Sequence, residues 1–150
     1  MAAIKCRVKG VYMAQGAMGA SPAVILAMDD ETCLPIYIGL WEAMSINSAI
    51  QKDVPPRPLT HDLFIDFLSR CNVTMRALVI DTLQEGVYYA NLILLQDQHE
   101  VTLDCRPSDG IALALRAEIP IFVDESVLAA AGQKNGDLPN IMDLATFLQK

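Results

Sequence analysis

The sequence predicts a mixed α+β fold with a largely antiparallel sheet and several packed helices. Polar and apolar side chains alternate from Lys5 to Lys9, which is the period of a half-buried strand. Behind Thr60, apolar side chains recur at the spacing of one helix face. Three apolar segments in the middle of the chain are separated only by short turns, as in an antiparallel meander: 75–82, 87–95 and 100–103.

The N-terminal part of the chain is expected to form strands. The first alternating segment extends to about Met13, and the small residues of 16–22 predict a loop. Two apolar segments, 23–28 and 34–39, flank an acidic turn at 29–31. This order predicts a hairpin.

Two helices are expected after this hairpin. Gly39 ends the last strand, and apolar residues between Met44 and Ile50 predict one helix face. The segment 52–58 contains three prolines, so it can be neither a helix nor a central strand. Thr60 is then the predicted N-cap of the second helix.

The C-terminal part mixes short elements. A third helix is predicted over 106–116, with Pro107 in its first turn and an apolar middle that should be buried. The remaining predicted elements are a strand at 119–123, a small helix after Asp124, a polar loop at 132–136 and a terminal helix over 138–149.

Length and composition are typical of a globular protein. The 150 residues, taken as a single domain over 1–150, are 53% apolar and 19% charged, which suffices to bury a core. No apolar run approaches the ~20 residues of a membrane helix. The start of the chain lacks the pattern of a signal peptide. We therefore expect a cytoplasmic protein with no membrane partner.

Charge and cysteine content narrow the function further. The net charge of −7 argues against broad electrostatic binding of nucleic acid, which needs a basic surface. It leaves open a small nucleic-acid enzyme that recruits cations to a carboxylate site. The four cysteines stand singly and only two histidines are present, so a structural zinc site is not expected.

Two short segments, 57–62 and 104–109, carry the same residue types in the same order: arginine, proline, a hydroxyl residue and an aspartate. Each leads into a predicted helix. A helix start offers free N–H groups and a partial positive charge, and an arginine ahead of it adds a planar fork suited to phosphate. Brought together, two such starts would form an anion pocket. The candidate substrate-binding residues are Arg57, Thr60, Arg106 and Ser108.

The same residues also have a purely structural interpretation, which stays open at this point. Thr60 and Ser108 are ordinary N-caps, and an aspartate in the first turn of a helix complements the helix dipole. Caps are far commoner than active sites. The ion pairs expected under this interpretation are Arg57–Asp109 or Arg106–Asp62.

Several acids near the predicted ends of elements suggest metal-assisted hydrolysis. Converging carboxylates bind Mg²⁺ or Mn²⁺, and a metal held near phosphate drives hydrolysis. The candidate metal ligands are Asp62, Asp104 and Asp109, with Glu42 as a fourth candidate acid. His61 begins its helix and is a candidate general base. Solvated surface carboxylates explain any single one of these acids equally well.

Three segments in this order resemble the bifunctional nuclease domain family: 34–43, 57–63 and 104–116. The resemblance is strongest over 34–132. It implies a mixed α+β domain that often self-associates and that hydrolyses RNA and DNA. It also implies that a divalent metal assists this hydrolysis. Gly110 departs from the family pattern, which usually has alanine there. The motif positions that the resemblance singles out are Glu42, Arg57, Thr60, His61, Asp62, Asp104, Arg106, Ser108, Asp109 and Arg116. The resemblance thereby adds Arg116 to the candidate substrate-binding residues.

Three functions therefore remain open. The leading one is a nuclease, supported by the density of motif residues. The others are a non-catalytic module that holds an anion or nucleotide, and a structural self-associating protein; the net charge of −7 favours these two. Because an apolar fraction of 53% is high for a domain of this size, we also expect a homo-oligomer that buries part of this surface.

Overall fold

Nine strands and five α-helices form in the part of the chain described by a computed structural model, residues 2–138 and 140–149. The strands are β1 (Ala3–Gly16), β2 (Gly19–Ala27), β3 (Thr32–Tyr37), β4 (Val73–Gln84), β5 (Val87–Gln96), β6 (His99–Cys105), β7 (Ile121–Asp124), β8 (Gln133–Lys134) and β9 (Ile141–Asp143). The helices are α1 (Leu40–Gln51), α2 (Thr60–Arg70), α3 (Pro107–Ala117), α4 (Glu125–Ala131) and α5 (Leu144–Leu148), with a 3₁₀ turn at Asn135–Asp137. None of these helices combines the length and the apolar character needed to cross a bilayer.

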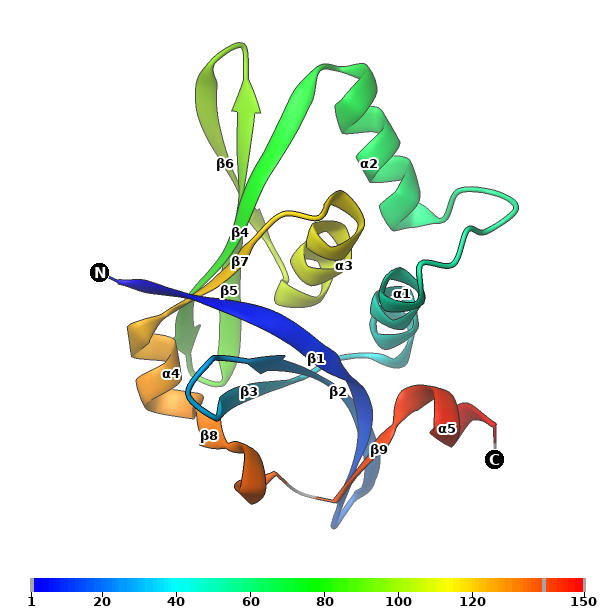
Figure 1. The fold of residues 1–150 in the computed structure, drawn as a ribbon, viewed down its shortest axis with the longest axis vertical. Coiled ribbons are helices and arrows are strands. Elements are labelled where there is room, and N and C mark those ends of the chain that lie inside the picture. Colours follow the sequence, from blue (N-terminus) through cyan, green and yellow to red (C-terminus); the bar gives the residue numbers. More distant parts are fainter. Residues whose placement is uncertain (1, 139, 150) are drawn as a thin grey trace.

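The strands form one mixed, largely antiparallel sheet, as the sequence predicts. Its order is β6-β5-β4-β7-β1-β2-β3-β8, with β9 paired to β1 beside this path. Among the strand pairs of the described residues, only β4–β7 is parallel. The long strand β1 joins two halves of the sheet, because residues 3–6 pair with β7 and residues 7–16 pair with β2 (Figure 1).

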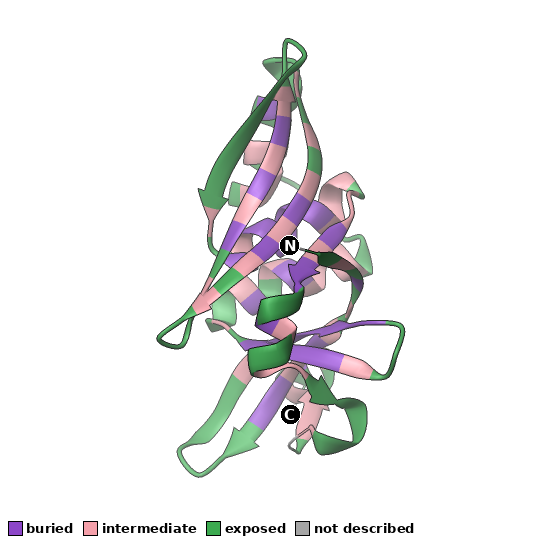
Figure 2. Ribbon diagram, turned by 90° about the vertical axis from the view of Figure 1, so that its left-hand side faces the viewer, coloured by how far each residue is buried: buried purple, intermediate pink, exposed green. Residues whose placement is uncertain are grey.

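The core extends through both halves as a single hydrophobic cluster. Leu78 and Ile80 on β4 and Leu92 on β5 are buried on one face of the sheet, and neighbouring residues along the strands are more exposed (Figure 2). This alternation is the pattern of a sheet with one covered face. Helix α3 covers β4 and β5 and is buried from Ile111 to Ala114.

Three helices lie together beside the sheet. Helix α3 is the middle one and contacts both α1 and α2 (Figure 1). Helix α1 also packs on β1 and β2, and α2 packs on β4. The three helices therefore come from different parts of the chain, and both α1 and α2 have α3 as a neighbour.

The starts of α2 and α3 differ from the predicted caps. The N-cap of α2 is Leu59, so Thr60 is the first helical residue, and the Asp62 carboxylate accepts a hydrogen bond from the Leu59 N–H at 3.1 Å. Pro107 begins α3, as predicted, because its fixed φ suits the first helical position. Ser108 is consequently inside the helix and buried, and it does not act as a cap.

Two predicted elements near the ends of the chain were wrong. The predicted loop at 16–22 is a tight hairpin turn, because β1 and β2 continue to pair as far as Gly16 and Gly19. The predicted terminal helix over 138–149 is instead β9 followed by the short α5, since residues 141–143 pair with residues 12–14 of β1. Pro139, which falls within that predicted helix, lies outside the described residues.

Helix α3 approaches β4 closely at Gly110. A Cβ atom added at Gly110 would collide with the side chain of Leu78 and would lie 3.1 Å from the Cys105 Sγ. Leu78 has no exposed surface, so its side chain has no solvent-filled space to move into. Close packing of helix on sheet therefore explains the glycine at this position.

We expect Gly110→Ala to lower the free energy of unfolding by about 1 kcal/mol. Overpacking a core costs about 1–3 kcal/mol, whereas replacing a helical glycine by alanine regains up to ~1 kcal/mol. Denaturant unfolding of the two proteins measures the difference. Equal or higher stability of the variant would show that Leu78 yields and would contradict the packing explanation.

Candidate functional site

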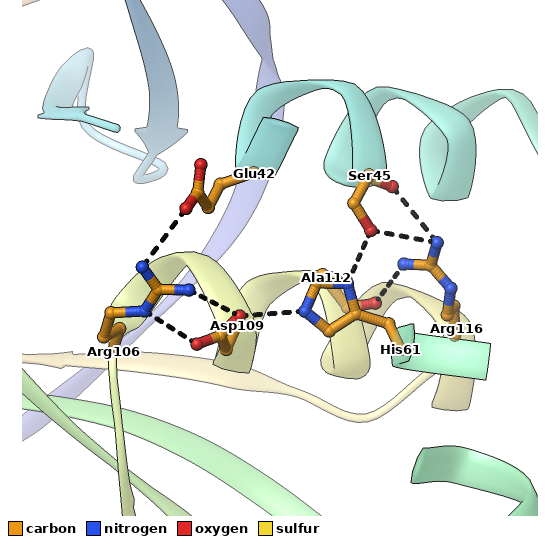
Figure 3. Close-up of polar contacts among 7 residues, drawn as sticks. All are labelled: Glu42, Ser45, His61, Arg106, Asp109, Ala112 and Arg116. Atoms are coloured by element: carbon orange, nitrogen blue, oxygen red, sulfur yellow. Dashed lines mark hydrogen bonds and ion pairs between the residues drawn. The ribbon is translucent and has the colours of Figure 1, made fainter. Parts of the chain in front are cut away.

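Polar side chains from α1, α2 and α3 meet where the three helices lie together. Glu42 and Ser45 belong to α1, and His61 lies in the first turn of α2. Arg106 precedes α3, and Asp109 and Arg116 lie on it. Figure 3 shows these side chains connected by hydrogen bonds and ion pairs in a continuous row.

His61 is at the centre of this row. Its Nδ1 lies 2.6 Å from the Ser45 Oγ, and its Nε2 lies 2.9 Å from the Asp109 Oδ1. The imidazole is only 15% exposed. This contact also brings together the starts of α2 and α3, the two helices that follow the arginine-proline segments.

The surrounding donors favour one arrangement of protons on His61. Arg116 Nη2 donates to the Ser45 Oγ at 3.2 Å, which leaves the Ser45 hydroxyl proton free to be donated to His61 Nδ1. His61 Nε2 then carries the ring proton and donates it to Asp109. In this neutral form every polar atom of the imidazole has a partner.

Arg106 holds Asp109 from the other side. Its Nε donates to the Asp109 Oδ2 at 2.8 Å and its Nη2 to the Oδ1 at 3.2 Å, which is the forked geometry of a strong arginine–carboxylate pair. Its Nη1 reaches the Glu42 Oε1 at 3.2 Å. The Arg106 side chain is 63% exposed, so this guanidinium is open to solvent and to ligands.

Arg116 is the less exposed arginine of the site. It is 11% exposed and donates to the Asp62 Oδ1 at 3.0 Å. It also donates to the Ala112 carbonyl at 2.9 Å, and to the Ser45 carbonyl and hydroxyl at 3.3 and 3.2 Å. Arg116 thus links all three helices. Its Nε, Nη1 and Nη2 all donate to oxygens of the protein, and this differs from the free guanidinium expected of a phosphate ligand.

These contacts fix the charge of two aspartates. Partial burial would raise the pKa of Asp109, but hydrogen bonds from Arg106 and His61 outweigh it and hold the pKa below its ordinary value. Burial of Asp62 is likewise outweighed, mainly by the hydrogen bond from Arg116, and its pKa is also lowered. Both side chains are therefore negatively charged at neutral pH.

A cavity of about 760 Å³ opens over this row of residues. Glu42, Ser45, His61, Arg106 and Asp109 all line it. Its rim is apolar in part, and the contributing side chains are Trp41, Met44, Leu59 and Leu148. A space of this size with a few convergent polar groups is typical of a small-ligand or active site.

Of the remaining predicted site residues, one lines the cavity and the others lie outside it. Thr60 lines the cavity, and Ser108 lines a second hollow of about 530 Å³ on the far side of Arg106. Asp104 is exposed on β6, opposite Asn91, and is not among the residues that line the cavity. Arg57 is exposed and takes part in no ion pair among the described residues.

The pairing of charges differs from the structural interpretation of the sequence. Arg106 pairs with Asp109 and Glu42, and Asp62 pairs with Arg116. The expected pairs Arg57–Asp109 and Arg106–Asp62 are therefore wrong, because each aspartate is held by an arginine of α3 or its N-cap. Over residues 2–138 and 140–149, no three His, Cys, Asp or Glu side chains converge as metal ligands.

Ser45 was missed by the sequence reasoning. One signal was available, because Glu42 and Ser45 are three residues apart and so lie on the same face of a helix. Because Glu42 was a candidate acid, the Ser45 hydroxyl one turn later on the same helix could have been added to the candidate site residues.

Comparison with known proteins agrees with this description. The family model of the bifunctional nuclease domain matches residues 24–136. The chain belongs to the bifunctional nuclease domain family. The match covers both arginine-proline segments and every residue of the row in Figure 3.

Individual relatives of this bifunctional nuclease domain are longer proteins. An uncharacterized protein of Mycobacterium tuberculosis (strain CDC 1551 / Oshkosh) is 46% identical over 99 residues, which are 66% of this chain and 58% of that protein. In Oryza sativa subsp. japonica, Bifunctional nuclease 2 is 29% identical over 116 residues and Bifunctional nuclease 1 is 26% identical over 117. The chain spans 36% and 35% of those two proteins, about a third of their length.

The lowered pKa values of Asp62 and Asp109 predict how the stability of the domain depends on pH. The unfolded chain binds more protons than the folded one between the folded pKa and the ordinary value, so stability rises with pH in that interval. The contribution is complete above ~4, the unfolded pKa, and is lost as pH falls through the folded values.

We therefore expect the free energy of unfolding to fall as the pH is lowered below about 4, and Asp109→Asn to reduce this dependence. Denaturant unfolding of both proteins over a series of pH values provides the measurement. The matched control is Asp66→Asn, an exposed aspartate of α2 whose pair with Arg70 lies at the surface. Identical pH profiles for the parent and Asp109→Asn would contradict the assignment.

Proposed function

We propose that this domain hydrolyses phosphodiester bonds of RNA or DNA in the cavity formed by α1, α2 and α3. The observation that carries the proposal is the contact of His61 with Asp109 at the cavity, in a chain of the bifunctional nuclease domain family. A histidine held by a carboxylate is the usual arrangement for moving a proton to and from an oxygen.

The residues around the cavity have separate roles in this proposal. His61 accepts the proton of the attacking oxygen and returns it to the leaving oxygen. Asp109 orients the imidazole and stabilises its charged form. Arg106 binds the phosphate, because its exposed guanidinium contacts Glu42 and can exchange this carboxylate for a phosphate oxygen. Thr60 lines the same cavity and can donate a hydrogen bond to the substrate.

A divalent cation enters the proposal in a restricted form. Mg²⁺ in phosphoryl-transfer sites is usually held by one or two carboxylates together with substrate phosphates, so three protein ligands are not required. Glu42 and Asp109 are the carboxylates that would hold Mg²⁺ or Mn²⁺ here. The cation would supply positive charge against the phosphate and the two acids.

A second candidate function is a non-catalytic module that binds a nucleotide or another anion. The specific observation in its favour is that the site arginines are already paired, Arg106 with Asp109 and Arg116 with Asp62, in a protein with a net charge of −7. Such a module needs only Arg106 and the cavity. It predicts binding without turnover.

Cleavage assays separate these two functions. Labelled single- and double-stranded RNA and DNA are incubated with the protein and Mg²⁺, Mn²⁺ or a chelator. We expect His61→Gln and Asp109→Asn to lower the cleavage rate at least about 100-fold, since a positioned acid–base group contributes about 10²–10⁴-fold. Melting temperatures of both variants report whether the fold is kept.

The control and the discriminating variant come from the same chain. Asp66→Asn, at an exposed position of α2, should cleave like the parent. Asp104→Asn tests the metal ligand predicted from sequence on β6, and its loss of activity would move the reaction away from the cavity. Binding of oligonucleotides with no cleavage under any of the three cation conditions would favour the non-catalytic module.

We also propose that the domain self-associates through α2. Leu59, Leu63 and Phe67 are 52%, 59% and 59% exposed, and their spacing of four residues places them along one helix face. This stripe is symmetric about Leu63. A two-fold interface needs such a self-complementary patch, because the same surface is used by both copies.

Leu63→Glu is expected to shift the protein to the monomer, because it places a charge at the centre of the apolar stripe. Light scattering and sedimentation at micromolar concentration measure the mass. Met18→Glu is the control, since Met18 is fully exposed in the turn between β1 and β2 and far from α2 in sequence and in the fold (Figure 1). A parent protein that is already monomeric would refute the proposal.

A further inference from the structure

Ser45 has no role in the proposed function, yet it is the side chain closest to His61. Its Oγ lies 2.6 Å from His61 Nδ1, and it lines the same cavity as His61 and Asp109. We propose that Ser45 is a nucleophile activated by His61, so that phosphoryl transfer in this cavity passes through a covalent bond to the serine oxygen. The inference rests on the proposed function for its substrate, whereas the reactivity of the serine is independent of it.

The geometry meets the requirements of an activated serine. The nucleophile must lie within about 2.6–3.2 Å of a base, and a third group must orient that base. Ser45, His61 and Asp109 satisfy both conditions, with distances of 2.6 and 2.9 Å. Their order is serine, histidine, aspartate, and such sets are recognised by geometry and role, not by chain position.

The two arginines complete the electrostatic requirement. Arg116 Nη2 donates to the Ser45 Oγ at 3.2 Å and stabilises negative charge on this oxygen as its proton leaves. Arg106 holds Asp109 with two hydrogen bonds, so the carboxylate stays charged and fixed behind the imidazole. Its exposed guanidinium is placed at the same cavity to neutralise a phosphate.

The proposed reaction has two steps. Ser45 Oγ attacks phosphorus and forms an O–P bond, the bond from phosphorus to the leaving sugar oxygen breaks, and His61 carries the serine proton to that oxygen. Water then attacks phosphorus, the O–P bond to Ser45 breaks, and the water proton returns through His61 to the serine. Water is the only reactant consumed besides the phosphodiester.

The test uses a probe that needs no nucleic acid. An alkyl fluorophosphonate phosphonylates a serine that is activated by a histidine: an O–P bond to the serine forms, the P–F bond breaks and fluoride is released. We expect one adduct per chain of the parent protein, which carries no substitution. Peptide mass spectrometry should locate this adduct on Ser45. His61→Gln should slow the reaction at least about 100-fold, in line with the loss of a general base. Ser45→Ala should abolish the adduct.

Ser48 provides the matched control. It lies one turn after Ser45 on α1 and lines the same cavity, but it has no described hydrogen bond to His61. Ser48→Ala should react like the parent. Because the adduct is mapped on the parent chain, a Ser45 variant that fails to fold does not weaken the test.

The outcomes separate this inference from the proposed function. An adduct at Ser45 that depends on His61, together with nucleic-acid cleavage, supports both. An adduct at Ser45 without cleavage supports the activated serine and refutes the nuclease. Cleavage without an adduct, or with adducts spread equally over several serines, overturns the nucleophile and leaves His61 acting on another oxygen.

Discussion

The guanidinium of Arg116 is the group on which the arrangement of the site helices depends. It is 11% exposed, and its donors reach Asp62 on α2, Ala112 in its own helix and both oxygens of Ser45 on α1. A lysine cannot replace these fixed, forked donors with its single ammonium group. Since a charge that is largely removed from water needs its partners, shifting α1 or α2 independently of α3 would cost free energy.

Local pairing of charges changes the meaning of the acidic composition. The chain has a net charge of −7, but two of the carboxylates that line the cavity, Glu42 and Asp109, are both bound by Arg106. Charges separated by more than about 8 Å are largely screened at physiological salt. A phosphate group entering the cavity therefore meets mainly these groups, in which the Arg106 guanidinium offsets one of the two negative charges. Net charge describes the whole surface and is a poor guide to a single recessed site.

Patterns that are local in sequence predicted the parts of the fold that depend on local contacts. The meander β4–β5–β6 was predicted because each strand pairs with the next one along the chain. The end of the chain was not, because β9 pairs with β1 across almost the whole sequence. The cavity residues follow the same division. His61, Arg106 and Asp109 belong to recognisable motifs, whereas the sequence offers only the three-residue spacing from Glu42 for Ser45, and its role depends on the contact with His61 in the folded chain.

The position of β1 in the sheet bears on how the protein is made. Among the strands of this domain β1 is synthesised first, but it joins the two halves of the sheet through β7, which is completed only at Asp124. Pairings between residues so far apart in sequence form slowly, because the chain loses much entropy in closing the loop. The three-stranded units β1–β2–β3 and β4–β5–β6 can each form early, because each strand pairs with the next one along the chain. During synthesis these two partial sheets therefore have open inner edges, and the cavity between α1 and α3 is assembled only after α3 and β7 have been made.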